Sequence, residues 1–511
     1  MDNSQNNIGY FPQMPVCDKH SSVELNSDFS LPDYQPEIRR LLSSRAIILP
    51  QNEYIGNGNA EASGEINYKI TYLGADGSIY CANLSDKYSF SSPLEFNLHN
   101  VNTDEVTLLP SCKTESINVR VLGPRKLNVR SKLDCHLYAF SPALFTPNLV
   151  GSHNKSALEN QVFETSCINV KKSVNESKIL NEFISFDSDN DNFRIIDCIS
   201  DAIINECSAT NDKIAVRGDV VLKIFYCNET ESAHPLITTK KIPFSQELSC
   251  IGVNSLYECY AKGVCFDERF DFQNNGVAVE LTLLLSAMAQ RNETVKYIYD
   301  SYSTEKKTES SSADLIITNN ARCSHANLTQ NDIFSLENIK LSPDAKIINI
   351  TCKSVLNELI KENEKLIFKG VNDYQLIYFL DGEYSSVSLN SPVKYELDSR
   401  SIPEFTKAFK WRAESSVPSV RARHDGERLF VDCELNFNIA LYYEHEIKLL
   451  NEVIFGEHHN KNNSQILLCY PEKNATIWNV AKHYGESQRA IRQKNSIPEN
   501  ENGIKRRFLV I

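Results

Sequence analysis

The sequence predicts a mainly β protein, in which three tandem β-rich domains precede a small β-α-α-β module. Two observations support this fold class. A stretch of alternating apolar residues recurs three times along the 511 residues, and the apolar spacing becomes helical after residue 466. Period-two alternation is typical of a strand with one buried face, whereas a stripe at i, i+3, i+4 and i+7 is typical of a helix.

The repeat is defined by landmarks that keep their order and spacing. In each copy a glycine precedes a tyrosine by eight positions, and a further aromatic residue follows that tyrosine after 17 or 18 positions. The glycines are 154 and 152 residues apart, a period that fits whole domains rather than solenoid repeats. The landmark pairs are Gly64 and Tyr72, Gly218 and Tyr226, and Gly370 and Tyr378.

The second copy is the clearest of the three. Gly218 interrupts its first alternating run, where a β-bulge or a close backbone approach is expected. The residues predicted to form the core of this domain are Leu222, Ile224, Tyr226, Phe244 and Leu283.

The segments between the repeats are polar. Residues 74–77 (Gly-Ala-Asp-Gly) predict a hairpin turn after the first strand. Residues 187–192 and 458–464 are predicted linkers, and residues 304–314 are a predicted polar break. The expected divisions are a flexible lead-in over 1–30, repeats over 31–175, 193–310 and 341–456, and the small module over 466–511.

Charge and cysteine content restrict the function and the compartment. The chain has 53 basic and 66 acidic residues, and a net charge of −13 argues against nucleic acid or an anionic membrane as the main partner. No run of 18 apolar residues occurs, so no transmembrane segment is predicted. The N-terminal residues lack the pattern of a secretory signal, and the fifteen cysteines are therefore expected to be free thiols in the cytoplasm.

Motifs of catalysis and cofactor binding are absent from the sequence. It contains no phosphate-binding glycine loop, no CxxC pair, no G-x-S-x-G and no HExxH. Cys323 with His325, and His458 with His459, are the close groupings of soft ligands, and both lack partners at metal-site spacing. We therefore predict no catalytic site, no cofactor and no metal site.

The C-terminal module is predicted to contain two short helices. Ile477, Val480, Ala481 and Tyr484 form one apolar helix face, with Thr476 as a cap at its start. Gly485 can end this helix, and Ser487 can cap a second one. The apolar segments 466–470 and 508–511 flank the pair as strands.

This module resembles a LysM domain. The shared pattern is Thr476, Ile477 and Trp478, then an aliphatic-alanine pair, Tyr-Gly and a later Asn495. LysM domains usually bind N-acetylglucosamine chains, so the resemblance implies either that role or a docking role derived from it. The residues we expect to contact a partner or a glycan are Thr476, Ile477, Trp478, Arg489, Arg492, Lys494 and Asn495.

The repeats resemble the SPOCS domain of spore-envelope proteins from endospore-forming bacteria. The shared residues are Gly218, the segments 224–226 and 242–245, and the Tyr-Asp-Ser-Tyr-Ser sequence over 299–303. SPOCS repeats followed by a LysM-like module resemble coat-morphogenesis proteins of clostridial type. This resemblance implies a scaffold in the mother-cell cytoplasm, at the forespore surface. Its implied partner is the coat ATPase, stage IV sporulation protein A.

Two other functions remain open at the level of sequence. The chain could bind peptidoglycan of the cortex or wall through the module, or it could be a lytic enzyme. A wall binder should carry an export signal and the Gly-Asp that usually precedes the LysM threonine, which is Asn474-Ala475 here. The module is formally +4 and leaves −17 for the rest of the chain, which favours an acidic protein partner.

Overall fold

The computed structural model describes most of the chain. The described residues are 8–49, 52–95, 105–152, 154–186, 193–228, 234–273, 276–398, 400, 402, 404–405, 407–459, 467–472, 474–499, 501, 503–504 and 507–511. The acidic segment 187–192 and most of the predicted linker over 458–464 lie outside these residues.

The first domain is a sandwich of two antiparallel sheets. One sheet has the order β1-β7-β6, and in the other β4 pairs with β2, β3 and β5. The strands are β1 (Tyr10–Ser30), β2 (Ile38–Ile48), β3 (Asn52–Gly56), β4 (Asn59–Gly74), β5 (Ile79–Pro93), β6 (Thr107–Gly123) and β7 (Lys126–Leu144).

The second domain repeats this plan. Its central strands are β15, which pairs with β9, β10 and β14, and β12, which lies between β11 and β13. A short strand β8 (Asn148–Val150) and a 3-10 turn (Lys155–Ala157) precede it. The strands are β9 (Leu158–Lys172), β10 (Glu176–Ser185), β11 (Phe193–Thr210), β12 (Lys213–Asn228), β13 (Leu236–Ser249), β14 (Glu258–Gln273) and β15 (Gly276–Ser303).

The third domain has the sheets β16-β21-β20 and β17-β18-β19. Strand β8, from the segment between the first and second domains, pairs with β21 in parallel. The elements are β16 (Lys306–Ser335), the short helix α1 (Leu336–Ile339), β17 (Lys346–Glu362), β18 (Lys365–Leu380), β19 (Glu383–Asp398), β20 (Phe409–His424) and β21 (Arg428–His458). The mainly β fold class predicted from the sequence is confirmed.

The predicted core of the second domain is also confirmed. Leu222, Ile224, Tyr226, Phe244 and Leu283 are all buried in one cluster between the two sheets. Tyr226 stacks on Phe186 with ring centroids 4.2 Å apart. The hairpin turn over residues 74–77 is present between β4 and β5, with Gly77 at a positive φ of 84°.

The landmark glycines of the second and third domains lie opposite β-bulges. Gly218 pairs with Ile204, and the register of β11 shifts between Ile204 and Glu206. A Cβ on Gly218 would lie 2.0 Å from the carbonyl oxygen of Ile203, and Gly370 meets the carbonyl of Val355 at the same distance. The expectation of a bulge and a close approach at Gly218 is confirmed, because only glycine leaves room for that carbonyl.

The opening edge strand of each domain departs from the prediction. Residues 10–30 are not a flexible lead-in, because they form β1 and pair with β7 along its length. Strands β9 and β10 precede the limit expected at 193, and β16 runs through the supposed polar break over 304–314. These strands are polar because each lies at the edge of its sheet and leaves much of one face in solvent.

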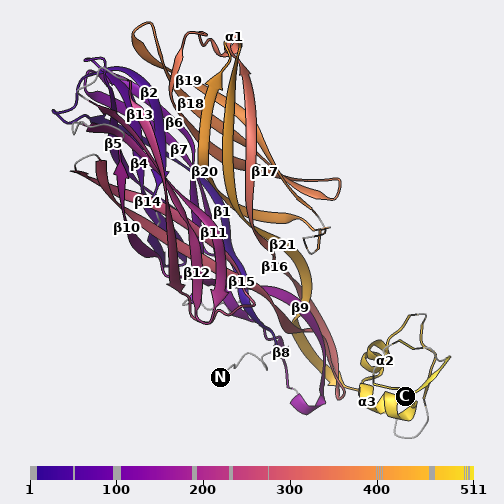
Figure 1. The fold of residues 1–511 in the computed structure, drawn as a ribbon. Coiled ribbons are helices and arrows are strands. Elements are labelled where there is room, and N and C mark those ends of the chain that lie inside the picture. Colours follow the sequence, from indigo (N-terminus) through magenta and orange to yellow (C-terminus); the bar gives the residue numbers. More distant parts are fainter. Residues whose placement is uncertain are drawn as a thin grey trace.

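The C-terminal module has the predicted β-α-α-β order. It consists of β22 (Leu468–Cys469), α2 (Ile477–Tyr484), α3 (Gln488–Lys494) and β23 (Leu509–Val510). Thr476 and Ser487 cap the two helices by accepting hydrogen bonds from Asn479 and Ala490, and Gly485 ends α2 at a positive φ of 64°. In Figure 1 the module lies at the far end of the long strands, away from the sandwiches.

The three domains pack around a common axis as one body. Three apolar clusters each contain residues from all three domains. In one of them, β2, β11 and β17 each contribute a bulge residue at the corresponding position, namely Leu42, Ile196 and Ile348. The repeats therefore form an approximate threefold arrangement within a single chain.

Candidate functional site

The C-terminal module is attached to the body through the end of β15. The indole N–H of Trp478 donates a hydrogen bond to Oδ2 of Asp300 at 2.9 Å. Nζ of Lys482 donates to both oxygens of the same carboxylate, at 2.6 and 2.8 Å. Trp478 and Lys482, one turn apart on α2, thus both contact the carboxylate of Asp300 in the second domain.

Tyr302 completes this junction. Its ring is fully buried in the core of the module and meets the indole of Trp478 edge-on, with centroids 4.9 Å apart. Its hydroxyl donates to the carbonyl of Glu486 at 2.9 Å. Asp300 and Tyr302 belong to the Tyr-Asp-Ser-Tyr-Ser segment over 299–303. This segment of the second domain therefore forms the contacts that attach the module.

Four of the expected site residues have structural roles. Ile477 is buried and Thr476 caps α2. Asn495 is buried and ties α3 to β23 through hydrogen bonds with the backbone of Val510. Trp478 is neither an exposed hot spot nor solely an internal core residue, because it anchors the module to the body.

The basic residues of α3 divide into two kinds. Arg492 donates to the carbonyls of Pro498 and Glu501, at 2.5 and 2.8 Å, and so holds the following loop. Arg489 and Lys494 are exposed, as is Arg507 before β23. Among the described residues these three side chains form no ion pair.

Exposed apolar side chains lie on the two-stranded sheet of the module. The rings of Tyr470 and Phe508 are 6.3 Å apart, and 66% and 47% of these residues are accessible to solvent. Leu467 and Leu468 are similarly exposed. Exposed aromatic and arginine side chains are a composition typical of protein interfaces.

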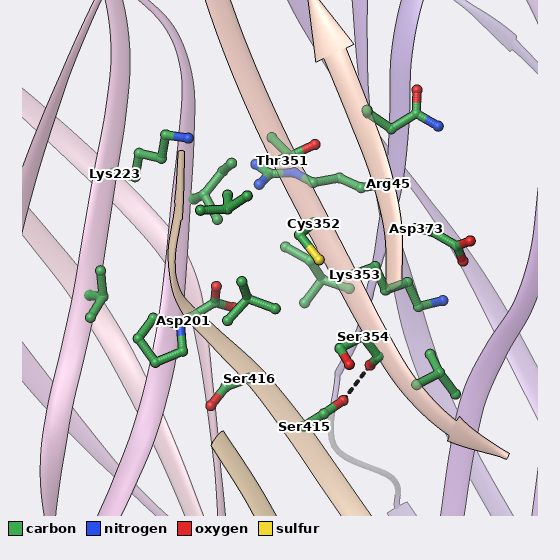
Figure 2. A pocket seen from close by; sticks show the side chains of 18 of the residues that line it. Arg45, Asp201, Lys223, Thr351, Cys352, Lys353, Ser354, Asp373, Ser415 and Ser416 are labelled. Atoms are coloured by element: carbon green, nitrogen blue, oxygen red, sulfur yellow. Dashed lines mark hydrogen bonds between the residues drawn. The ribbon is translucent and has the colours of Figure 1, made fainter. Parts of the chain in front are cut away.

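A second candidate site is the cavity at the centre of the body. It has a volume of about 1250 Å³ and is lined by two edge strands from each domain, β2 and β6, β11 and β14, and β17 and β20, together with residues of β12, β13, β18, β19 and β21. Figure 2 shows Lys223, Asp201 and Lys353 among the side chains around it, with the short hydrogen bond between the hydroxyl of Ser415 and the backbone of Ser354.

Lysines near this cavity connect neighbouring domains. Lys69 of the first domain donates to the carbonyl of Cys198 in the second at 2.8 Å, and Lys223 of the second donates to Ile350 in the third at 2.7 Å. Lys353 of the third donates to Thr114 in the first at 2.7 Å and closes the ring. These lysines are not among the residues predicted to form a site. The available signal was that Lys69 and Lys223 each follow a landmark glycine by five residues.

Burial perturbs the charged groups of the cavity. Desolvation raises the pKa of Asp201 to about 6, although Arg45 and Lys223 attract its charge. Desolvation also lowers the pKa of Lys223 to about 8, against the attraction of Asp197 and Asp201. Lys223 therefore connects the second and third domains at an electrostatic cost.

The fold and the junction define a class: a multidomain β protein that carries a small C-terminal module with two helices. Comparison of the sequence with known protein families finds one family that matches part of the second domain. The family described as "SipL, SPOCS domain" matches residues 193–268, and this part of the chain is similar to that domain. The match covers β11, β12 and β13 and most of β14.

SPOCS is a structural domain of the spore coat rather than a catalytic one, and the match indicates a role in spore-coat morphogenesis. No LysM domain is detected in the chain. No curated protein matches the sequence. Within the described residues, no helix has the length and apolar character needed to cross a membrane.

Proposed function

We propose that this protein is a non-enzymatic adaptor that tethers coat layers to the forespore through protein–protein contacts. The proposal rests mainly on one observation: a body containing a structural spore-coat domain holds a basic module at its far end. We further propose that the first and third domains are SPOCS-like, because their landmark residues and bulges correspond to those of the second.

The partner surface proposed for the LysM-like module is the part left free by the junction. Trp478 and Lys482 are engaged with Asp300, so the exposed cations among the described residues of the module are Arg489, Lys494 and Arg507, and the exposed rings of Tyr470 and Phe508 belong to the same module. Such a surface suits an acidic protein with apolar side chains. We propose the coat ATPase, stage IV sporulation protein A, as that partner, in the mother-cell cytoplasm at the forespore surface.

A charge-reversal experiment tests this proposal. Arg489→Glu combined with Lys494→Glu should weaken binding of the full chain to purified stage IV sporulation protein A by about tenfold or more, and added salt should weaken binding of the parent. Arg492 must be left unchanged, because its loss would release the loop that it holds. The matched control is Lys87→Glu with Lys126→Glu, which makes the same charge change on exposed strands of the first domain.

The result that would overturn the proposal is equal binding by the parent, the control and the double variant. Capture of the full chain on chitin or peptidoglycan, lost in the double variant, would instead support the glycan-binding alternative.

A further inference from the structure

Two histidines and two aspartates meet on one face of the first domain. His20 on β1 pairs directly with His136 on β7, and their rings stack in parallel with centroids 4.0 Å apart. Asp18 lies two residues before His20, and Asp134 two residues before His136, so all four side chains project from the same side of the β1-β7 ladder. Oδ1 of Asp18 is 2.7 Å from Nε2 of His136.

The distances fit a shared cation. One ligand atom from each of Asp18, His20 and His136 can be chosen so that all three lie within 4.8 Å of one another. Ligand atoms around a tetrahedral zinc ion, each about 2 Å from the metal, are roughly 3.4 Å apart. The two stacked rings would have to turn so that their nitrogens converge with Oδ1 of Asp18 on one ion, with the fourth position left to water.

We propose that Asp18, His20 and His136 form a binding site for a zinc(II) ion. Imidazole nitrogens and a carboxylate oxygen are a ligand set that zinc prefers, and hard cations such as magnesium favour oxygen alone. The site goes beyond the adaptor function, since it lies in the first domain and away from the module.

The neighbouring side chains support this assignment. Nζ of Lys410, from the third domain, contacts the other oxygen of Asp18 and is itself 2.7 Å from Glu444, and Oδ1 of Asp18 is left facing Nε2 of His136. Asp134 lies 3.8 Å from Nδ1 of His20 and places a second carboxylate beside the ion. Outer carboxylates of this kind orient histidine ligands and raise their affinity for metals.

An ion can reach the site without any opening of the fold. The side chain of His20 is 67% exposed and that of Asp134 is 56% exposed. Asp18 and His136 line a cavity of about 780 Å³ between the domains, together with Lys410. A bound ion would cross-link β1 to β7 and, through Lys410, would couple the first domain to the third.

Spacing along the sequence gives no sign of this site. His20 and His136 are 116 residues apart, and residues 1–30 were expected to be an unstructured lead-in. The prediction of no metal site rested on the groupings at Cys323 and His325 and at His458 and His459. In the structure, Nδ1 of His325 instead contacts the side chain of Asn438.

The test is calorimetric titration of the full chain with zinc chloride, in a phosphine reductant that keeps the thiols reduced. We expect one ion per chain in the parent, affinity reduced at least ~10-fold in His20→Ala and in His136→Ala, and a smaller loss in Asp134→Asn. His325→Ala is the matched control and should bind like the parent. Because His20 is exposed, its removal should not endanger folding.

Cobalt(II) substitution gives an independent measurement. A site of imidazole and carboxylate ligands should show only weak d–d bands, and these should disappear in His20→Ala. Equal zinc affinity in the parent and both histidine variants would overturn the proposal, as would an intense thiolate charge-transfer band, because the ion would then be bound by cysteines.

Discussion

The three-domain body and the C-terminal module are held in place by different interactions. The body is closed by clusters of buried side chains that each draw on all three domains, and by a ring of lysines donating to backbone carbonyls. The module is attached mainly through Asp300 and Tyr302. A substitution in the body should therefore lower the free energy of unfolding of the whole chain. A substitution at the junction should release the module and leave the body folded.

The largest effect is expected in the core of the second domain. Tyr226→Ala should lower the free energy of unfolding by about 3–5 kcal/mol, because it removes a buried ring stacked on Phe186. The urea midpoint measured by circular dichroism checks this, with Tyr34→Ala as the control at a position 84% exposed. A Tyr226→Ala midpoint equal to that of the parent would mean that this tyrosine does not support the fold.

The landmark glycines offer a graded comparison. Gly218→Ala and Gly370→Ala should each cost about 2–3 kcal/mol, because the new Cβ meets a backbone oxygen at 2.0 Å. Gly64→Ala should cost less, since its nearest neighbour is the movable side chain of Tyr88. Gly123→Ala, with no atom within 4 Å, should change the urea midpoint little. Equal effects at all four positions would refute the role of the bulges.

The buried carboxyl group of the central cavity should oppose folding at neutral pH. The pKa of Asp201 is raised from 3.8 to about 6 in the folded state, so the folded protein binds more protons between these values. Stability should therefore fall as pH rises through this window, and the penalty is complete at pH 7.

Asp201→Asn removes this penalty. The variant should be more stable than the parent by about 1–2 kcal/mol at pH 7, a figure reduced for partial solvent screening, and the difference should vanish near pH 4. Urea midpoints at both values measure the change. A variant less stable than the parent at pH 7 would show that the carboxylate makes a favourable interaction.

The smallest effect on global stability, and the sharpest on the module, is expected at the junction. Asp300→Asn removes the charge that Lys482 contacts and should weaken attachment of the module. In a Trp411→Phe background, excitation selective for tryptophan reports Trp478 alone, and its fluorescence should shift to the red as water reaches the indole. An unchanged spectrum with an unchanged urea midpoint would show that Asp300 does not anchor the module.

Much of this architecture could be predicted from the sequence, and the reasons for the failures are physical. Alternation and fixed landmarks predicted the β repeats, the core around Tyr226 and the bulge at Gly218, because these depend on local geometry. The edge strands, such as β1, were missed because their polar faces hide the alternation. The ring of lysines and the cluster at His20 depend on strands far apart in the sequence, and pairing between them leaves no local pattern.

The same difference between local contacts and contacts distant in the sequence applies to the predicted site residues. The helix caps Thr476 and Ser487 were predicted because a cap is a local feature. The role of Trp478 could not be predicted, because its partner Asp300 lies 178 residues earlier in the chain. Arg492 is a different case, because it holds a loop of its own module through carbonyls six and nine residues ahead, and the sequence does not distinguish it from the exposed Arg489.

The position of the protein in sporulating cells tests the central claim most directly. A fluorescent fusion of the full chain should form a shell around the forespore, and the Arg489→Glu, Lys494→Glu variant, folded and equally abundant, should remain dispersed in the mother-cell cytoplasm. The control with Lys87→Glu and Lys126→Glu should localise like the parent. A double variant that still surrounds the forespore would contradict the account, as would a parent fusion that never reaches it.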